Sequence, residues 1–225
     1  MRAVSEMVFR DRQEAGQILA ELVATLPELG DAIVLGLPRG GVPVAYEVAR
    51  ACKLPLDILV VRKLGVPGQE ELAMGAIASG GMIALNEDVL RAHHVTERKF
   101  TDVAERERQE LERREREFRC GRGPLEIAGR TVILVDDGLA TGASMRAAIR
   151  AVKGRARQVI VAVPVGAKST CHELTAEADR VLCALSPEPL DAVSQFYQDF
   201  EATSDEEVKQ LMCKGMREWE DRQIF

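Results

Sequence analysis

The chain of 225 residues is poor in the residues that build metal sites and disulfide frameworks. It contains three histidines and five cysteines, an odd number, and no two cysteines form a Cys-x-x-Cys pair. The histidines also lack the spacing of metal ligands, because adjacent residues such as His93 and His94 point in different directions on a helix. Neither a structural zinc site nor a disulfide framework is therefore expected.

Long apolar runs are also missing. Uncharged apolar stretches such as residues 32–38 and 131–135 are far shorter than the ~20 residues that a membrane helix needs. The first residues, MRAVSEMVFRDRQEAG, bring charges where a secretory signal has its apolar core. We therefore expect a cytoplasmic protein that makes no use of a membrane.

Basic residues are fewer than acidic residues. The 30 Lys and Arg residues against 36 Asp and Glu residues give a net charge of −6. Binding to DNA irrespective of sequence draws on clustered Lys and Arg, so no DNA partner is expected, although local groups could still hold a small anion. An apolar content of 46% suffices for a folded core, and the length suits one domain of roughly 100–200 residues with a small addition.

Short apolar runs alternate with helical patterns along the chain. Amphipathic helices are predicted over residues 11–26, with Asp11 as the N-cap, and over residues 42–53. Buried strands rich in Val, Ile and Leu are predicted over residues 32–37, 56–61, 130–135, 158–163 and 180–184, with helices after the third and fourth. This alternation predicts an α/β fold with a parallel sheet covered by helices on both faces.

Two segments interrupt the alternation. Residues 65–86 hold five of the 18 glycines, which indicates hairpins or a mobile flap. Residues 96–119 carry eight acidic and eight basic side chains, many of them three or four positions apart. This pattern predicts a long, solvated helix.

Residues 132–144, VILVDDGLATGAS, are the most informative stretch. A buried strand is followed by Asp136 and Asp137, and a turn of small residues then opens a helix. Ligands of open α/β sheets bind at this end of the strands. The turn lets backbone N–H groups approach a phosphate at a helix N-terminus, and the carboxylates can accept hydrogen bonds from vicinal hydroxyls or bind a divalent cation. Together these features point to a ribose phosphate ligand.

The same stretch resembles the phosphoribosyl pyrophosphate motif of the type I phosphoribosyltransferases. The resemblance covers most of residues 8–200 and is strongest to a group of bacterial phosphoribosyltransferases that share GLPRGGVPVA and RKLGVPGQEELAMGAIA. It implies one phosphoribosyltransferase-like domain over residues 1–225, with a flap at 65–86, a helical insertion at 87–120 and a C-terminal helical segment at 186–225. It also implies transfer of 5-phosphoribosyl to a nitrogenous acceptor, such as a nucleobase, with release of pyrophosphate.

The resemblance assigns roles to individual residues of this sequence. Asp136 and Asp137 would contact the ribose hydroxyls and serve as the ligands of Mg²⁺. The substrate-binding residues it implies are Ala140, Thr141, Gly142, Ala143 and Ser144 for the 5′-phosphate, and Arg39, Gly40, Gly41, Arg62 and Lys63 for pyrophosphate. Asp136, Asp137, Arg39 and Lys63 would carry catalysis, with Arg62 and Lys63 placed where the second strand ends at the edge of the sheet.

The acceptor is less defined. Enzymes of the hypoxanthine-guanine type resemble this motif but place an Asp where this chain has Ala140, which disfavours a 6-oxopurine handled through that carboxylate. In the family a variable hood holds the acceptor, and here the N-terminal helix or residues 186–200 could supply it, with Phe196 and Tyr197 as candidate stacking partners. A homodimer is a further expectation from the resemblance.

Two other functions remain open from the sequence. The fold could serve a regulator that binds phosphoribosyl pyrophosphate or a nucleotide without turnover, because a fold does not settle a function. A second alternative is another phosphoribosyl chemistry, such as hydrolysis or phosphorolysis of a nucleotide. Product analysis separates both from transfer to a base.

Overall fold

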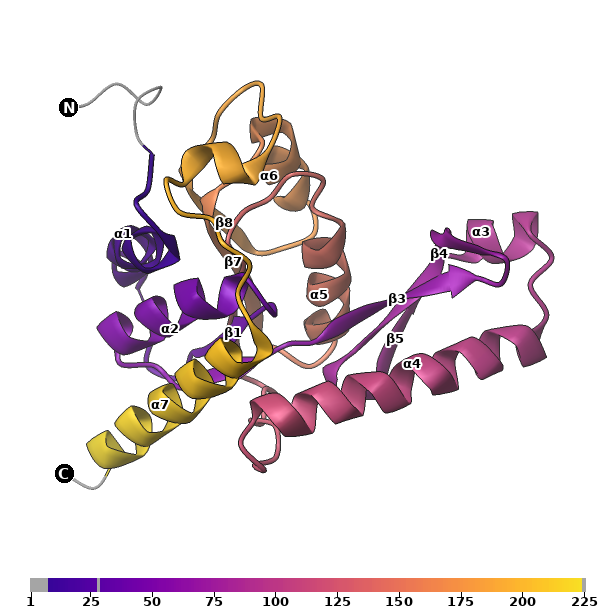
Figure 1. Ribbon diagram of the computed structural model, residues 1–225, viewed down its shortest axis with the longest axis horizontal. Helices are drawn as coiled ribbons and strands as arrows, with labels where there is room; N and C mark the ends of the chain where they lie inside the picture. The colour runs from indigo at the N-terminus through magenta and orange to yellow at the C-terminus, as the bar shows by residue number, and fades with distance from the viewer. Residues whose placement is uncertain (1–7, 28, 224–225) are drawn as a thin grey trace.

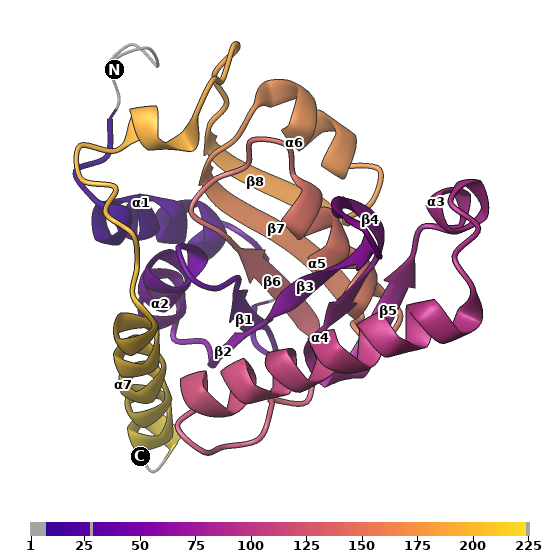
Figure 2. The ribbon, with the colours of Figure 1, turned by 45° about the vertical axis from the view of Figure 1, so that its right-hand side comes forward.

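The computed structural model describes residues 8–27 and 29–223. At its centre lies a five-stranded parallel sheet with the strand order β2-β1-β6-β7-β8, seen in Figure 2. Its strands are β1 (Ile33–Gly36), β2 (Leu56–Ile58), β6 (Thr131–Val135), β7 (Gln158–Val165) and β8 (Arg180–Leu185). The predicted parallel α/β sheet is confirmed.

Helices cover both faces of this sheet. Along β6, Val132 and Leu134 pack into one apolar cluster, whereas Ile133 and Val135 pack into another, as the alternation of a strand requires. The first cluster includes α5 (Ala143–Lys153) and α6 (Lys168–Leu174); the second includes α1 (Arg12–Ala24), α2 (Gly41–Cys52) and α7 (Asp205–Gln223). The sheet thus presents its carboxyl ends between two helical layers, which is where ligands bind in such folds.

Helix α1 begins as its sequence predicts. Asp11 has an extended backbone, and its side chain accepts a hydrogen bond of 2.8 Å from the backbone N–H of Glu14. This contact satisfies one of the N–H groups that have no partner inside the helix. The cap fixes the first turn of α1 and with it the position of Arg12.

The glycine-rich segment forms a second, antiparallel sheet in the order β3-β4-β5. Its strands are β3 (Val61–Val66), β4 (Gln69–Ala78) and β5 (Met82–Leu85), with a short 3-10 turn, Ser79–Gly81, before β5. The predicted hairpins are therefore present, but the predicted strand over 56–61 is wrong at its end. The parallel strand stops at Ile58. Val60 donates its N–H to Ser79 Oγ (2.8 Å), which lies just after β4 of the second sheet.

Helices α3 (Glu87–Ala92) and α4 (Glu97–Phe118) follow, and Figure 1 shows α4 running along β3 and β5. The prediction of a long helix is confirmed, but the helix is not solvated all round. Leu111 and Phe118 are fully buried, and Glu107 pairs with Arg62 of β3 at 2.5 Å. Its charged residues therefore cover the outer face while a narrow apolar stripe packs inward.

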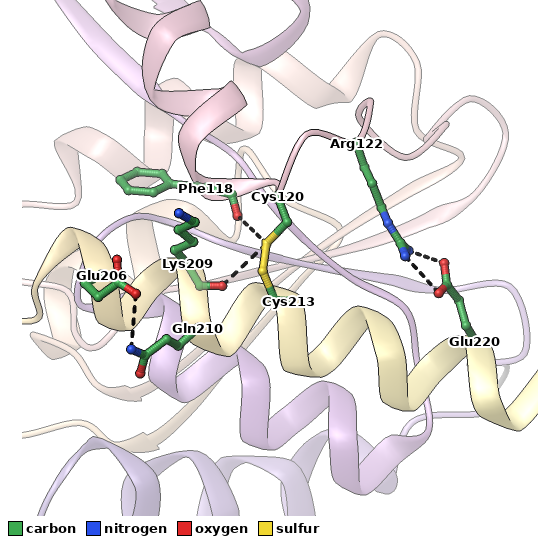
Figure 3. The surroundings of a disulfide bond; sticks show 8 residues. All are labelled: Phe118, Cys120, Arg122, Glu206, Lys209, Gln210, Cys213 and Glu220. Atoms are coloured by element: carbon green, nitrogen blue, oxygen red, sulfur yellow. Dashed lines mark hydrogen bonds and ion pairs between the residues drawn. A yellow bond between two sulfur atoms is a disulfide. The ribbon is translucent and has the colours of Figure 1, made fainter.

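A disulfide joins Cys120, just after α4, to Cys213 in the middle of α7 (Figure 3). Arg122 forms an ion pair with Glu220 farther along α7. The sequence analysis did not foresee this bond, because its two cysteines lie 93 positions apart and meet only through the packing of the chain ends. No helix in the described part of the chain combines the length and the apolar character that a bilayer crossing requires.

Candidate functional site

Two adjacent carboxylates stand at the carboxyl end of β6. Asp136 and Asp137 follow Val135, the last residue of the strand, and Asp136 Oδ1 accepts a hydrogen bond of 2.9 Å from the backbone N–H of Asp137. Both residues are partly exposed, whereas the strand before them is fully buried. The end of a central strand thus offers negative charge to a ligand.

The loop between β1 and α2 lies directly against this pair. Leu37 donates its N–H to the carbonyl of Val135 (2.9 Å), which brings the two strand ends together. A Cβ on Gly40 would lie 2.0 Å from Asp137 Oδ2, and one on Gly41 would lie 2.7 Å from the Val135 carbonyl oxygen. A side chain at position 41 would collide with the backbone at the end of β6, whereas a side chain at position 40 would displace the Asp137 carboxylate.

Arg39, in the same loop, is half-exposed. Its guanidinium lies 3.6 Å from the carboxylate of Asp205, the first residue of α7. An exposed ion pair of this kind contributes little to stability, so the side chain is available to an incoming anion.

The turn at residues 140–144 opens helix α5. Gly142 has a left-handed backbone with φ of 72°, and Thr170 donates its hydroxyl to the carbonyl of Ala140 (2.8 Å). The exposed residues Thr141, Ala143 and Ser144 surround the first N–H groups of the helix, which have no partner inside it. This arrangement suits an anion at a helix N-terminus.

A cavity of about 480 Å³ separates the turn from the antiparallel sheet. Lys63 lines it together with Thr141 and Ser144, so the structure brings this predicted basic residue to the turn. Arg62 is not brought there: neighbouring residues of a strand point to opposite faces, and its guanidinium pairs with Glu107 on α4. Both residues belong to β3 and not to the end of the second parallel strand, which corrects the expected placement.

The sequence analysis missed Arg12, at the start of α1. Its Nε and Nη2 lie 2.9 and 2.8 Å from Asp137 Oδ2. Tyr197, expected to stack on an acceptor, is buried, and its hydroxyl donates to the backbone carbonyl of Asp137 (2.7 Å). Nothing in the local pattern signals these contacts, because they join segments 125 and 60 positions apart.

The electrostatics of the pair follow from this geometry. Burial, and then the negative charge of Asp137, raise the pKa of Asp136 well above its usual value. Burial also raises the pKa of Asp137, although the Arg12 guanidinium opposes the shift. The site therefore favours ligands that bring positive charge or hydroxyl donors to the two carboxylates.

In the described residues, no group of three or more His, Cys, Asp or Glu side chains is placed to hold a metal ion. Asp137 Oδ2 is engaged by Arg12, which leaves Asp136 as the freer carboxylate. Two carboxylates suit Mg²⁺ where a phosphate ligand supplies the remaining oxygens.

Comparison with known proteins assigns the chain to a family. A family model described as the phosphoribosyl transferase domain matches residues 10–194. The chain belongs to this family. The matched range includes the parallel sheet, the β1–α2 loop, the Asp136–Asp137 pair and the turn that opens α5. The family expected from the sequence is thereby confirmed.

Relatives of known sequence and structure agree with this assignment. Two curated proteins from Mycobacterium tuberculosis, of strains CDC 1551 / Oshkosh and H37Rv, are each 44% identical over 214 residues, and their names assign them provisionally to the phosphoribosyl transferases. The match covers 94% of this chain and 48% of theirs, so the chain spans about half the length of these relatives. The crystal structure of TT1426 from Thermus thermophilus is 42% identical, covers 92% of this chain and 99% of that chain, and matches with a TM-score of 0.82.

Proposed function

We propose that this chain transfers the 5-phosphoribosyl group of phosphoribosyl pyrophosphate to a nitrogenous acceptor, with release of pyrophosphate. One observation carries the proposal: the Asp136–Asp137 pair lies against the Gly40–Gly41 backbone and is followed directly by the turn that opens α5. A ribose that carries an anionic group at each end needs hydroxyl acceptors between two anion sites. The family membership supports the same activity.

Each part of the donor has a matching part of the site. The 5′-phosphate is assigned to residues 140–144, whose N–H groups and hydroxyls surround the start of α5, with Lys63 facing them across the cavity. The ribose hydroxyls are assigned to Asp136 and Asp137. Pyrophosphate is assigned to the backbone N–H groups of Gly40 and Gly41 and to Arg39. Arg62 is left out, because it does not line this cavity and its partner Glu107 is largely buried, whereas Glu71, which pairs with Lys63 at 3.0 Å, is fully exposed.

Mg²⁺ fits this site as an ion that arrives with the donor. Asp136 and Asp137 would hold it, and donor oxygens would supply its remaining ligands. When bound, the ion would neutralise negative charge that develops on the departing pyrophosphate. The residues of the chain then orient the ribose and keep its anionic ends apart.

The reaction breaks the bond between C1′ and the pyrophosphate oxygen, and pyrophosphate leaves with the bonding electron pair. A lone pair of the acceptor nitrogen forms the new bond to C1′ from the opposite face, and the acceptor loses its proton. Positive charge accumulates on the ribose in the transition state, where the two carboxylates stabilise it. Arg39 stabilises the opposite charge on the departing pyrophosphate, and Lys63 holds the 5′-phosphate.

The proposal is tested by product analysis. The protein is incubated with phosphoribosyl pyrophosphate, Mg²⁺ and single nucleobases, and pyrophosphate and nucleotide are quantified by chromatography. Equal amounts of pyrophosphate and nucleoside monophosphate, formed only with one base, support transfer. Donor consumption without a base would instead show hydrolysis, and binding without consumption across the whole panel would show a regulator. An Asp136→Asn/Asp137→Asn variant controls for contaminating enzymes.

A further inference from the structure

The guanidinium of Arg12 is enclosed beside the carboxylate pair. The exposed fraction of its side chain is 12%, and that of Asp137 is 17%. Both contacts of 2.9 and 2.8 Å fall on the same oxygen, Oδ2. Gly40 lies beside the same oxygen, since a Cβ there would lie 2.0 Å from Oδ2 and 3.3 Å from Arg12 Nε. Oδ2 is therefore bound by Arg12 and crowded by the loop, which leaves Oδ1 as the oxygen that can turn toward a ligand.

The C-terminal part of the chain holds Arg12 in this position. Its guanidinium carbon lies 4.0 Å from the centre of the Phe200 ring, within the range of a cation–π contact. Its Nη1 donates to the backbone carbonyl of Glu201 (2.7 Å). The ring centres of Tyr197 and Phe200 lie 4.8 Å apart. The Tyr197 hydroxyl donates a hydrogen bond to the backbone carbonyl of Asp137. Tyr197, which the sequence suggested as a stacking partner for an acceptor, thus supports this cation and its carboxylate.

We infer that Arg12 is a positioning residue for donor binding: it fixes Asp137 so that Oδ1 accepts a hydrogen bond from a ribose hydroxyl. This inference rests on the proposed function. Without Arg12, Asp137 would lose the partner that holds Oδ2, and its carboxylate could leave the orientation in which Oδ1 is free for the ribose. Within the described residues, Arg12 meets the assigned donor site at Asp137 and the neighbouring Gly40.

A double-mutant cycle tests the inference. Binding of phosphoribosyl pyrophosphate with Mg²⁺ is measured by calorimetry for the wild type, Arg12→Gln, Asp137→Asn and the double variant. Each single change is expected to weaken binding about tenfold, because it breaks a largely buried charged pair. The double variant should bind no more than about twofold more weakly than Asp137→Asn, because Arg12 acts only through that carboxylate.

Two further variants separate positioning from general damage. Arg10→Gln makes the same change on an exposed side chain two positions earlier, which pairs with Asp11, and should leave affinity unchanged. Arg12→Lys keeps the charge without the planar fork and should recover part of the affinity that Arg12→Gln loses. Circular dichroism confirms that each variant is folded, and if Arg12→Gln does not fold, the cycle is run with Arg12→Lys.

The outcomes are distinct. Losses that multiply in the double variant would show that Arg12 supports the structure as a whole and would overturn the inference. Unchanged affinity in folded Arg12→Gln would overturn it as well. Absence of donor binding by the wild type would instead overturn the proposed function, and the inference would fall with it.

Discussion

At the scale of single residues, the site depends on the missing side chain of Gly40 as much as on the charges of Asp136, Asp137 and Arg12. Gly40 has a helical backbone with φ of −60°, which any residue adopts, so its backbone does not require glycine. The requirement comes from space, because Asp137 Oδ2 occupies the place of the Cβ. The loop can approach the Asp137 carboxylate this closely only if residue 40 has no side chain.

Gly40→Ala should therefore displace the Asp137 carboxylate without strain in its own backbone. We expect affinity for phosphoribosyl pyrophosphate with Mg²⁺ to fall by about tenfold or more, equivalent to at least about 1.4 kcal/mol. The fold should persist, because Asp137 is partly exposed and can move aside. Calorimetry of the purified variant measures the loss.

Gly30→Ala is the matched control for this substitution, because a Cβ there meets no atom within 4 Å. Its affinity should equal that of the wild type. Equal affinity for Gly40→Ala would mean that the loop does not shape the donor site.

At the scale of elements, helix α1 matters because its first residue is Arg12. Burial raises the pKa of the capping Asp11, but the hydrogen bond from the Glu14 N–H and the charge of Arg10 outweigh it, so the pKa lies below its usual value. A carboxyl group with a lowered pKa stabilises the fold above its unfolded pKa, and this contribution disappears as the pH falls through the folded pKa.

Asp11→Ala should reduce the free energy of unfolding by about 1 kcal/mol at neutral pH. The difference from the wild type should become smaller as the pH falls through the folded pKa of Asp11, because the charged carboxylate is the stronger acceptor. Urea unfolding between neutral and acidic pH measures it, and Asp11→Asn should keep most of the cap without this pH dependence. A difference that stayed constant into acid would show that ionisation of Asp11 does not strengthen the cap.

The disulfide joins two elements that the sequence separates widely. Cys120 follows the long helix α4, and Cys213 lies within α7 (Figure 3). A cross-link between distant positions restricts the unfolded chain and stabilises a fold, typically by ~2–4 kcal/mol.

Cys213→Ser should lower the free energy of unfolding by about this amount, ~2–4 kcal/mol. Dithiothreitol should lower the stability of the wild type to that of the variant and should leave the variant unchanged. Urea unfolding with and without reductant checks both statements. If reductant destabilised the two proteins equally, the stabilisation would not come from this bond.

At the scale of the whole molecule, the sequence predicts what is local. The five parallel strands, the α1 cap and the hairpins follow from apolar periodicity, capping and glycine content. The Asp136–Asp137 motif is likewise read from neighbouring residues. The end of the strand predicted over 56–61 cannot be read in this way, because the apolar run over residues 58–61 hides the point where the chain leaves one sheet for another.

Contacts between segments that lie far apart in the chain could not be predicted from the sequence. Arg12 meets Asp137 across 125 positions, and Cys120 meets Cys213 across 93. Arg62 and Lys63 are adjacent and alike in charge, yet one pairs with α4 and the other faces the cavity beside α5. Strand alternation separates them, but which face meets which helix depends on the tertiary packing.

Donor binding tests the central claim most directly. Calorimetry with phosphoribosyl pyrophosphate and Mg²⁺ should show saturable binding to the wild type, and the Asp136→Asn/Asp137→Asn variant should lose it while keeping the circular dichroism spectrum of a folded protein. Binding that survives in the folded double variant, or no binding by the folded wild type, would contradict the account.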